Sequence, residues 1–355
     1  MRTLIFTPRE GKKLKMAVRA AKLHEYLKKN GVMTVLLPGF NFRKITPYMF
    51  MNYLKLIFFI LTKKSDDVVL LENERQPRLL DFFRLLSFKL ALDVRDNRAL
   101  QRSAYNLDDG PEKMATIKKN LLNNIQLSDY VFTVSQSCKQ LYPREFHDKI
   151  FVIENASDQN LFAFSELPKK PAVGFISGIA PGRGIELLID AMQLVKKKVP
   201  NVLLSIAGTP AIDNKESDTY YKKLKEKFAC KWIKFHDDIY YSVNASNFLQ
   251  QCFLTVIPHP DHLYYHTTLP VKLFDYLASG RPVVATNCRE TAHILQTYKC
   301  GLVSDFNAKD FSEKIMTLLA DRTLAKRMGA NGRKLIEEVY NWDYMAKKII
   351  AIVSK

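Results

Sequence analysis

The feature that most constrains the fold is a repeated alternation of short apolar runs with helical segments. In the C-terminal half the runs are AVGFISG, NVLLSIAG, FLTVIPH and RPVVAT. In the N-terminal half RTLIFT, VMTVLLPG, DVVLLEN and LALDVRDN follow the same pattern. Runs that are apolar at nearly every position, rather than at alternate positions, are typical of strands buried on both faces of a parallel sheet. The pattern therefore predicts an α/β fold.

The length and the restart of the pattern predict two domains. A chain of 355 residues is long enough for two cores of roughly 150 to 200 residues each. FSELPKKPAV lies between the two series of strands and is typical of a linker. We predict two doubly wound domains, over residues 1–165 and 166–335, and a final helix, 336–355, that returns to the first. Ligands of such folds bind at the carboxyl ends of the strands, here in a cleft between the domains.

The positive charge is concentrated at one end of the chain. The net charge is +18, and residues 1–64 contribute +12 of it, with 14 Lys and Arg against the two acids Glu10 and Glu25. Such a field attracts phosphates, so nucleic acid, an anionic membrane surface and a polyphosphate ligand are the candidate partners.

One apolar segment, TPYMFMNYLKLIFFILTKK, lies within this basic region. Lys55 interrupts it and Lys63 and Lys64 close it, so it is shorter than the roughly 20 residues that a membrane span requires. Two interpretations remain open for residues 48–64. The segment is either a core helix or an interfacial helix whose lysines contact anionic lipid.

The cysteines and the N-terminus indicate a reducing compartment. The five cysteines have no CxxC or other ligand-like spacing, which argues against a disulfide framework and against a zinc site. The first apolar run is too short for a secretion signal. We expect a cytoplasmic protein, and the basic apolar segment raises the alternative of peripheral attachment to the inner face of the cell membrane.

A glycine-rich turn joins a strand to a helix in GFISGIAPGRGIELLIDAM. The helix begins near Gly184, so its terminal amides and Arg183 would converge on one space, an arrangement that binds diphosphate. The spacing of Gly178, Gly182 and Gly184 does not match the dinucleotide fingerprint, which disfavours a nicotinamide enzyme. The alternative is an ordinary turn with a solvated arginine.

The loop after FLTVIPH leads into a second candidate element. Pro270 is suited to the first position of the helix PVKLFDYLAS, and Gly280 ends it. Lys272 and Asp275 lie three residues apart on this helix. A carboxylate facing a cleft from here would accept hydrogen bonds from both hydroxyls of a ribose. The alternative is a pair of surface charges that slightly stabilises the helix.

These elements together resemble a known family. PVKLFDYLASGRPVVAT resembles the P-x-K-x-x-E-x-x-x-x-G-x-P-V-v-a element of retaining glycosyltransferases of family 4, and FISGIAPGRGIELLIDAM resembles their v-G-x-x-x-x-x-K/R-G element. IFVIENASDQNLF is similar to their domain junction, SDYVFTVSQ to a-D-x-v-i-t-v-S, and LALDVRDN to a strand with D-x-x-D. The resemblance covers roughly residues 70 to 345. It implies the GT-B fold of two Rossmann-like domains facing each other across a cleft.

The resemblance implies transfer of a sugar from a UDP- or GDP-sugar to an acceptor hydroxyl, with retention of the anomeric configuration. It implies no metal and no cofactor beyond the nucleotide-sugar. Asp275 stands where the family's second glutamate holds the ribose, and Arg183 stands where a cation contacts the diphosphate. The remaining expected donor-binding residues are Gly11, Gly178, Gly208, Thr267, Thr268, Leu269 and Lys272.

The expected catalytic residues are Arg183, Lys272 and Asp96, and the expected acceptor-binding residues are Arg9 and Arg95. Asp93 is a further cleft candidate, and Asp96 at a strand end is also suited to capping a turn. We interpret four histidines as structural or solvated rather than catalytic: His24, His259, His262 and His266.

Three positions depart from the family pattern. Thr267 stands where many members have a first glutamate near the donor sugar. Gly178 stands where an arginine is common, so Arg183, Lys272 and helix amides would carry the diphosphate charge. Asp275 is one methylene shorter than the usual glutamate.

The expected acceptor is a glycan or a lipid-linked saccharide, in line with the basic and apolar N-terminal region. Two other classes stay open. A GT-B-fold sugar-nucleotide epimerase would share the donor contacts, and a non-enzymatic protein that binds nucleic acid or a membrane surface would explain the net charge. The lysines follow helices instead of alternating with aromatic residues, so we expect no nucleic acid partner.

Overall fold

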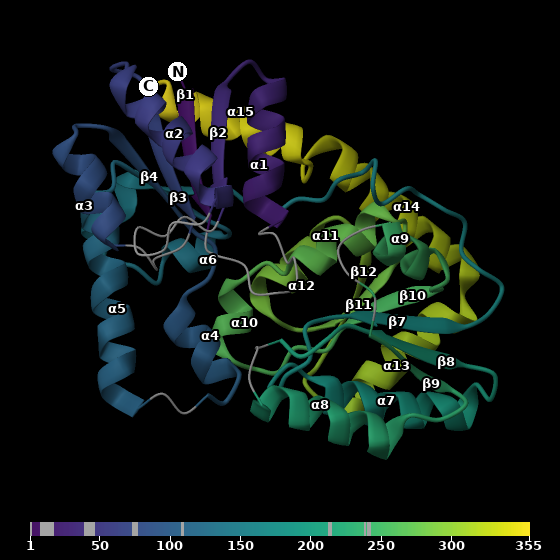
Figure 1. Ribbon diagram of the computed structural model, residues 1–355. Coiled ribbons are helices and arrows are strands. Elements are labelled where there is room, and N and C mark those ends of the chain that lie inside the picture. Colours follow the sequence, from purple (N-terminus) through teal and green to yellow (C-terminus); the bar gives the residue numbers. More distant parts are fainter. Residues whose placement is uncertain are drawn as a thin grey trace. The chain divides into compact units, whose positions relative to one another are not determined.

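The chain divides into two compact units (Figure 1, a computed structural model). The first unit comprises Met1–Ala99, Asp109–Glu154 and Trp342–Lys355, and the second comprises Leu100–Asp108 and Asn155–Asn341. The structure describes residues 2–7, 18–38, 47–72, 77–107, 110–211, 215–237, 239 and 243–355. Gly11 and Arg9, predicted to lie near the donor and the acceptor, fall outside these residues.

The first unit is built on a parallel sheet with strand order β2-β1-β3-β4-β5-β6. Its strands are β1 (Arg2–Thr7), β2 (Met33–Pro38), β3 (Val68–Glu72), β4 (Lys89–Val94), β5 (Tyr130–Thr133) and β6 (Ile150–Val152). Every residue of β3 is buried, as a continuously apolar run in a covered sheet requires. The β3–β4 register sets Glu72 beside Asp93 at the carboxyl end of the sheet.

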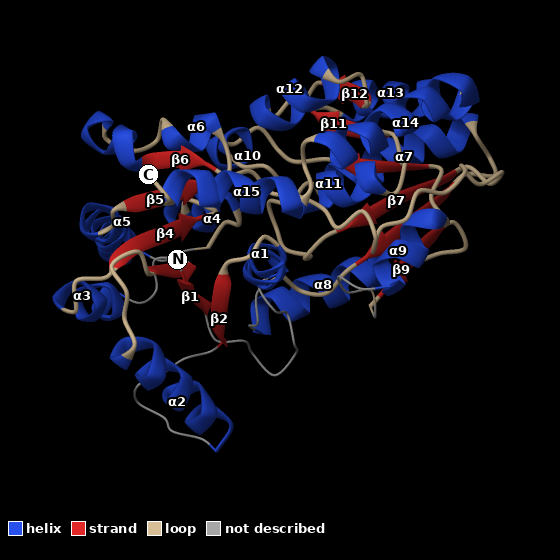
Figure 2. Cartoon of the chain, turned by 90° about the horizontal axis from the view of Figure 1, so that it is seen from above, coloured by secondary structure: helices blue, strands red, loops and turns tan. Residues whose placement is uncertain are grey.

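Helices lie on either side of this sheet (Figure 2). They are α1 (Val18–Lys29), α2 (Pro47–Leu61), α3 (Pro77–Leu85), α5 (Gly110–Leu127), α6 (Gln136–Lys139), the 3₁₀ helix Arg144–Lys149 and α15 (Trp342–Val353). The helix α4 (Arg98–Ala104) begins in the first unit and groups with the second from Leu100 onward. The C-terminal helix α15 packs on α1, and the Asn30 amide donates to Asp343 Oδ1 at 2.8 Å. In the described part of the chain, no helix is long and apolar enough to cross a bilayer.

The second unit has the strand order β12-β11-β10-β7-β8-β9, again with parallel pairing. Its strands are β7 (Ala172–Ile176), β8 (Leu203–Ala207), β9 (Ile233–His236), β10 (Leu254–Ile257), β11 (Val283–Thr286) and β12 (Gly301–Ser304). The order reverses between β7 and β10, because chain-successive strands are added outward from these two in opposite directions. This is the Rossmann strand order, whose ligands bind at the carboxyl ends of the two central strands.

The helices of the second unit connect and cover these strands. They are α7 (Ile185–Lys198), α8 (Lys215–Phe228), α9 (Val243–Gln250), α10 (Leu263–Thr267), α11 (Val271–Ala278), α12 (Arg289–Thr297), α13 (Ala308–Ala320) and α14 (Arg322–Glu338). The two parallel sheets confirm the predicted α/β class with two Rossmann-like units.

The segment that sequence analysis interprets as a linker, residues 164–173, lies inside the second unit. The buried Arg281 guanidinium donates to Ser165, and Arg322 donates to the Pro168 carbonyl at 2.9 Å. The last two residues of the segment begin β7. The units divide at Glu154 and Asn155, rather than at 165 and 166, because these contacts attach the whole segment to the second core.

Candidate functional site

The predicted donor-binding side chains gather at the switch point of the second sheet. Ser177 follows β7 directly, and His259 follows β10 by two residues. Lys272 and Asp275 lie on α11, which follows the β10 loop. Parallel strands end at one edge of the sheet, so these loops are neighbours although up to 98 residues separate Ser177 from Asp275 in the chain.

Two cationic side chains converge on one neutral hydroxyl. Arg183 Nε donates to Ser177 Oγ at 3.1 Å, and Lys272 Nζ donates to the same oxygen at 2.9 Å. Burial, and then the nearby Arg183 guanidinium, lower the pKa of Lys272 well below its usual range. No ion pair joins Lys272 to a carboxylate within the described residues. Two like charges at this spacing repel each other, so an anion bound between them would relieve the repulsion.

An aromatic wall supports Arg183. Its guanidinium carbon lies 5.0 Å from the Tyr105 ring centroid, and Nη1 contacts the Tyr105 hydroxyl. The Tyr105 ring meets Tyr264 edge-on at 6.0 Å, and the Tyr265 hydroxyl donates to the Gly182 carbonyl at 2.6 Å. Tyr105 comes from Leu100–Asp108, the segment of the N-terminal half that groups with the second unit. No motif in the sequence points to this tyrosine.

The N-terminus of α7 belongs to the same loop. Its N-cap is Gly184, with φ +80°, and a Cβ there would lie 1.6 Å from the Pro258 carbonyl oxygen, so only glycine fits. The cap supplies no side-chain acceptor to the first turn. The partial positive charge of the helix end therefore adds to that of Arg183.

His259 is buried near Lys272 and Arg183, with 3% of its surface exposed. Its ring stacks on Tyr265 at 4.3 Å between centroids. Burial, followed by the charges of Lys272 and Arg183, lowers the pKa of His259 well below its ordinary value, so the imidazole is neutral at physiological pH. Its Nε2 has no hydrogen-bond partner among the described residues.

Asp275 is also buried, with 7% of its surface exposed. Its Oδ1 accepts a hydrogen bond from the Ser157 hydroxyl at 2.7 Å. Burial raises the pKa of Asp275 to about 8; the Ser157 bond opposes this rise, and the Asp158 carboxylate adds to it. The carboxyl therefore holds its proton at neutral pH in the ligand-free protein. Ser157 lies in the junction element IENASDQNLF, but sequence analysis assigned it no role.

The other predicted donor-binding residues lie in the loops after β7 and β8 and at the end of α10. Gly178 and Gly208 belong to loops after β7 and β8, and a Cβ on Gly208 would lie 1.8 Å from the Ser177 carbonyl oxygen. The Thr267 hydroxyl donates to the Leu263 carbonyl at 3.0 Å. Thr268 caps α10, and the next carbonyl, of Leu269, accepts from the Asn155 amide at 2.7 Å.

The predicted catalytic and acceptor candidates Asp96 and Arg95 belong to the first unit. Arg95 Nη2 lies 3.1 Å from Glu72 Oε1, and Asp96 lies in the turn after β4. Asp93, the further cleft candidate, is paired with Arg19, which sequence analysis did not single out. Arg19 donates to both Asp93 oxygens, at 2.8 and 3.0 Å, and to the carbonyls of Ile153 and Glu154.

The remaining histidines make local contacts. His24 Nδ1 lies 2.8 Å from the Thr34 hydroxyl, and His262 Nδ1 accepts from the Tyr264 amide at the start of α10. His266 Nε2 lies 2.7 Å from Asp261 Oδ1. Within the described residues, no group of three His, Cys, Asp or Glu side chains is placed to hold a metal ion.

Comparison with known proteins identifies the family. The model of the family "Glycosyl transferases group 1" matches residues 157–335, which include Ser157, Arg183, Lys272 and Asp275. The chain belongs to this family. The matched range includes both cations that donate to Ser177, Arg183 and Lys272. The match does not favour the epimerase alternative.

Individual group 1 and GT-B proteins are similar at low identity. The GDP-mannose-dependent alpha-(1-6)-phosphatidylinositol monomannoside mannosyltransferase of Mycobacterium tuberculosis is 25% identical over 186 residues, which are 52% of this chain and 47% of that protein. The sucrose-phosphate synthase of Thermosynechococcus elongatus has a TM-score of 0.72 at 16% identity, over 100% of this chain and 98% of the other. HepE of Anabaena, solved in complex with UDP-glucose, has a TM-score of 0.71 at 14% identity, over 100% of both chains.

These likenesses establish the fold and the family. The solved structures support the GT-B fold that the resemblance implied, since each resembles this chain over nearly its whole length. The chain spans about half of the mycobacterial relative. The group 1 family establishes a glycosyltransferase, and the donor, acceptor and stereochemistry are separate questions.

Proposed function

We propose that this glycosyltransferase transfers a sugar from a UDP- or GDP-sugar to an acceptor hydroxyl, with retention of the anomeric configuration. The observation that carries the proposal is the pair of cations, Arg183 and Lys272, that donate to the single hydroxyl of Ser177. The relatives' names are in line with it, since one is GDP-mannose-dependent and another was solved with UDP-glucose.

The diphosphate of the donor binds between Arg183 and Lys272, at the N-terminus of α7. The guanidinium offers a planar fork to the phosphate oxygens, while Tyr105 holds it in place from the other side. A bound phosphate also raises the pKa of Lys272 back toward its usual range, because an anion favours the ammonium form. Three sources of positive charge then face one ligand group.

The ribose of the donor binds at Asp275. Its two hydroxyls donate to the carboxylate, and this requires loss of the proton that the ligand-free site retains at neutral pH. Ser157 keeps Oδ1 oriented through its 2.7 Å hydrogen bond. Thr267, Thr268 and Leu269 flank this position from the α10 loop.

The chemistry depends on electrostatic stabilisation of the leaving group. The bond from the anomeric carbon to the diphosphate oxygen breaks, and its electron pair moves to the diphosphate. The acceptor hydroxyl forms the new glycosidic bond, and its proton passes to the diphosphate oxygen that leaves. Charge on the leaving oxygen grows toward the transition state, so Arg183, Lys272 and the α7 amides lower the barrier more than they stabilise the bound substrate. No metal is needed in this scheme.

The acceptor is a glycan or a lipid-linked saccharide, and we place the reaction in glycan, lipid-linked oligosaccharide or polysaccharide synthesis at the cytoplasmic side of the cell membrane. The strongly basic N-terminal region supports an anionic or membrane-borne acceptor. Arg9 and Arg95 are the candidates for acceptor contacts in the first unit, and Asp96 is the catalytic candidate there.

The experiment is a thermal-shift titration with UDP, GDP and their sugars, in EDTA. A ligand at 100 times its dissociation constant adds about 2.7 kcal/mol to the apparent stability. We expect one nucleotide series to raise the melting temperature of the wild type but not of Arg183→Ala/Lys272→Ala. Lys309→Ala, which removes an exposed cation from α13 of the same unit, is the matched control and keeps the shift.

Two results would overturn the proposal. One is a nucleotide shift of wild-type size in Arg183→Ala/Lys272→Ala. The other is inversion of the anomeric configuration in the product, read by NMR of the new glycosidic linkage.

A further inference from the structure

The helix α2 of the first unit is apolar on two faces. Leu56 and Phe59 point into the core, with 4% and 2% of their surfaces exposed, and they pack in the cluster that contains Phe83 and Phe88. This face confirms that α2 contributes to the core, which is one of the two interpretations that the sequence left open for residues 48–64.

The opposite face of α2 carries a second apolar stripe that the core does not cover. Leu54, Ile57, Phe58 and Leu61 are 45%, 50%, 66% and 79% exposed. Their spacing, i, i+3, i+4 and i+7, places them in one row along the helix. Single exposed apolar residues are common, but a continuous row of four large ones marks an interaction surface.

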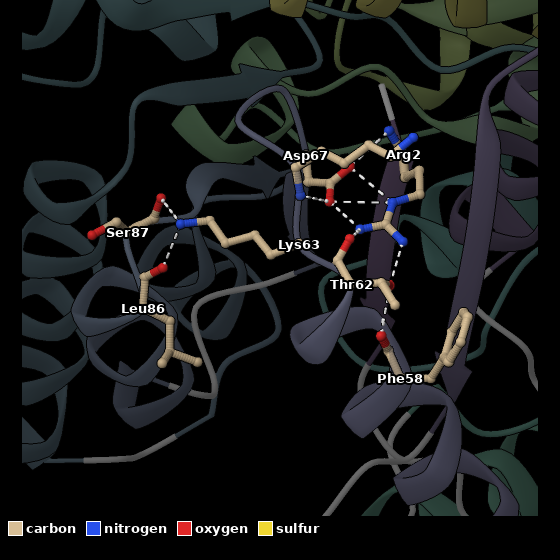
Figure 3. Close-up of polar contacts among 8 residues, drawn as sticks. Arg2, Phe58, Thr62, Lys63, Asp67, Leu86 and Ser87 are labelled. Atoms are coloured by element: carbon tan, nitrogen blue, oxygen red, sulfur yellow. Dashed lines mark hydrogen bonds and ion pairs between the residues drawn. The ribbon is translucent and has the colours of Figure 1, made fainter.

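The C-terminal end of α2 is fixed to the unit by polar contacts (Figure 3). Arg2 Nη1 donates to the Thr62 hydroxyl at 2.8 Å, and Thr62 in turn donates to the Phe58 carbonyl at 2.7 Å. Asp67 pairs with Arg2; burial opposes its ionisation, but the Arg2 contacts outweigh burial and lower the pKa of Asp67. The stripe is therefore presented by an anchored helix.

A second anchor reaches the neighbouring helix α3. Lys63 Nζ donates to the carbonyls of Leu86 and Ser87, at 2.7 and 2.8 Å (Figure 3). The end of α3 held by this lysine exposes Leu85, at 85%, and Phe82, at 37%. These two residues are further exposed apolar side chains of the first unit.

Basic side chains border the stripe. Lys55 follows Leu54 on α2, and Lys64 lies three residues beyond Leu61; both are exposed. Burial, then the charges of Lys28 and Lys55, lower the pKa of His24, so Lys28 of α1 and Lys55 of α2 lie near one imidazole. Asp66 offsets part of this charge. The net arrangement is an apolar row with a cationic margin.

We propose that this face of the first unit, Leu54, Ile57, Phe58 and Leu61 with Lys55 and Lys64, docks on the surface of an anionic lipid bilayer. The apolar row enters the boundary between headgroups and acyl chains, and the ammonium groups lie at the anionic headgroups. Charge complementarity favours lipid over a second copy of this chain, because pairing two such faces would bring like charges together.

The test is flotation of the full chain with vesicles of phosphatidylcholine and phosphatidylglycerol, and with vesicles of phosphatidylcholine alone. We expect binding to the anionic vesicles that weakens as salt rises. Phe58→Asp/Leu61→Asp should reduce the apparent partition coefficient at least tenfold. Leu122→Asp, which places the same charge at a 38% exposed leucine of α5 in the same unit, is the matched control and should bind like wild type.

The lysines are tested separately. Lys55→Gln/Lys64→Gln should reduce binding to anionic vesicles by about fivefold per lysine removed, and Lys118→Gln/Lys119→Gln on α5 should not. Lys63 is left unchanged because it anchors α3. Circular dichroism and the melting temperature verify that each variant is folded.

Three results would overturn the proposal. They are absence of wild-type binding to anionic vesicles, wild-type binding by Phe58→Asp/Leu61→Asp, and a dimer in light scattering that the same variant dissociates while no vesicle binds. The assay contains no nucleotide, so its failure would leave the proposed donor site intact, and loss of nucleotide binding would leave this surface intact.

Discussion

Buried charged side chains near the carboxyl ends of the strands contact different kinds of group in the two units. In the first unit, Arg19 and Asp93 are both 99% buried at the side chain and neutralise each other at 2.8 Å. Arg19 also donates hydrogen bonds to the main-chain carbonyls of Ile153 and Glu154. In the second unit, Arg183 and Lys272 both donate to the hydroxyl of Ser177.

This difference is consistent with a structural role for the first pair and with the ligand-binding role proposed for the second. A buried pair that is neutralised within the chain stabilises one conformation and has little left to offer a ligand. Two like charges that are held close together repel each other, and an anion placed between them lowers that repulsion. Sequence analysis grouped Asp93 with Asp96, Arg95 and Arg9 as cleft candidates, and the pairing with Arg19 supports a structural role for Asp93.

The largest expected effect tests the structural pair. Arg19→Ala leaves the Asp93 carboxylate buried without its cation and should destabilise the first unit by about 3–5 kcal/mol. Differential scanning calorimetry should show a lower melting temperature for Arg19→Ala, and less than additive loss in Arg19→Ala/Asp93→Ala. An unchanged melting temperature would mean that the comparison between the units has no energetic basis.

The next prediction concerns the two cations of the second unit, where removing a charge should not lower stability. Lys272→Met removes one of two like charges, so stability should hold or rise, while the transfer rate should fall about 10²- to 10³-fold, as for the loss of one preorganised donor to a developing oxyanion. Steady-state kinetics with the cognate donor and thermal melts without ligand measure the two quantities. If Lys272→Met loses stability but retains its transfer rate, Lys272 has a structural role and not the proposed role in binding the diphosphate.

The pH dependence of stability tests Asp275. Its pKa is about 8 in the folded protein against an ordinary 3.8, so the folded state retains a proton that the unfolded state releases. Stability therefore falls as pH rises through this window and levels off above pH 8. At a ceiling of about 1.4 kcal/mol per pH unit, we expect on the order of 2 kcal/mol between about pH 6 and pH 8. Asp275→Asn should lack this slope in ligand-free melts; a parallel slope would contradict the prediction.

The smallest effect tests the junction. Ser157→Ala removes the hydrogen bond to Oδ1 and should weaken nucleotide binding by about fivefold, equivalent to about 1 kcal/mol. It should also raise the pKa of Asp275, because that bond opposes the rise. Ser279→Ala is the control, since its hydroxyl donates to the main-chain carbonyl of Asp275 and not to the carboxylate. Calorimetric titrations of both variants with UDP or GDP compare them directly, and equal affinities would exclude a positioning role for Ser157.

Local signals predicted the elements well. The strand predicted over RTLIFT is β1, and the helix predicted to begin near Gly184 begins at Ile185 with Gly184 as its N-cap. Burial pattern, caps and glycines act within a few residues, so they can be recognised in one sequence. The motif PVKLFDYLASGRPVVAT likewise led to Lys272 and Asp275, which the structure places on one helix as expected.

Long-range partners could not be predicted in this way. Ser177 has no distinctive neighbours in the sequence, yet its hydroxyl accepts hydrogen bonds from both Arg183 and Lys272. The reason is that β7 lies beside β10 in the sheet. Tyr105 lies in the N-terminal half and reaches Arg183 because its segment groups with the second unit. The predicted linker was attached to the second core by Arg281 and Arg322, whose positions in the sequence are more than 100 residues away.

The amino-acid sequence by itself determined the alternation of strands and helices, the glycosyltransferase motifs and the cations and carboxylate that carry them. The tertiary structure alone decided which charged side chains meet each other and which groups each of them contacts. The physical reason is that a charge has a definite energy only once its burial and its neighbours are known, and both depend on strand order rather than on sequence distance.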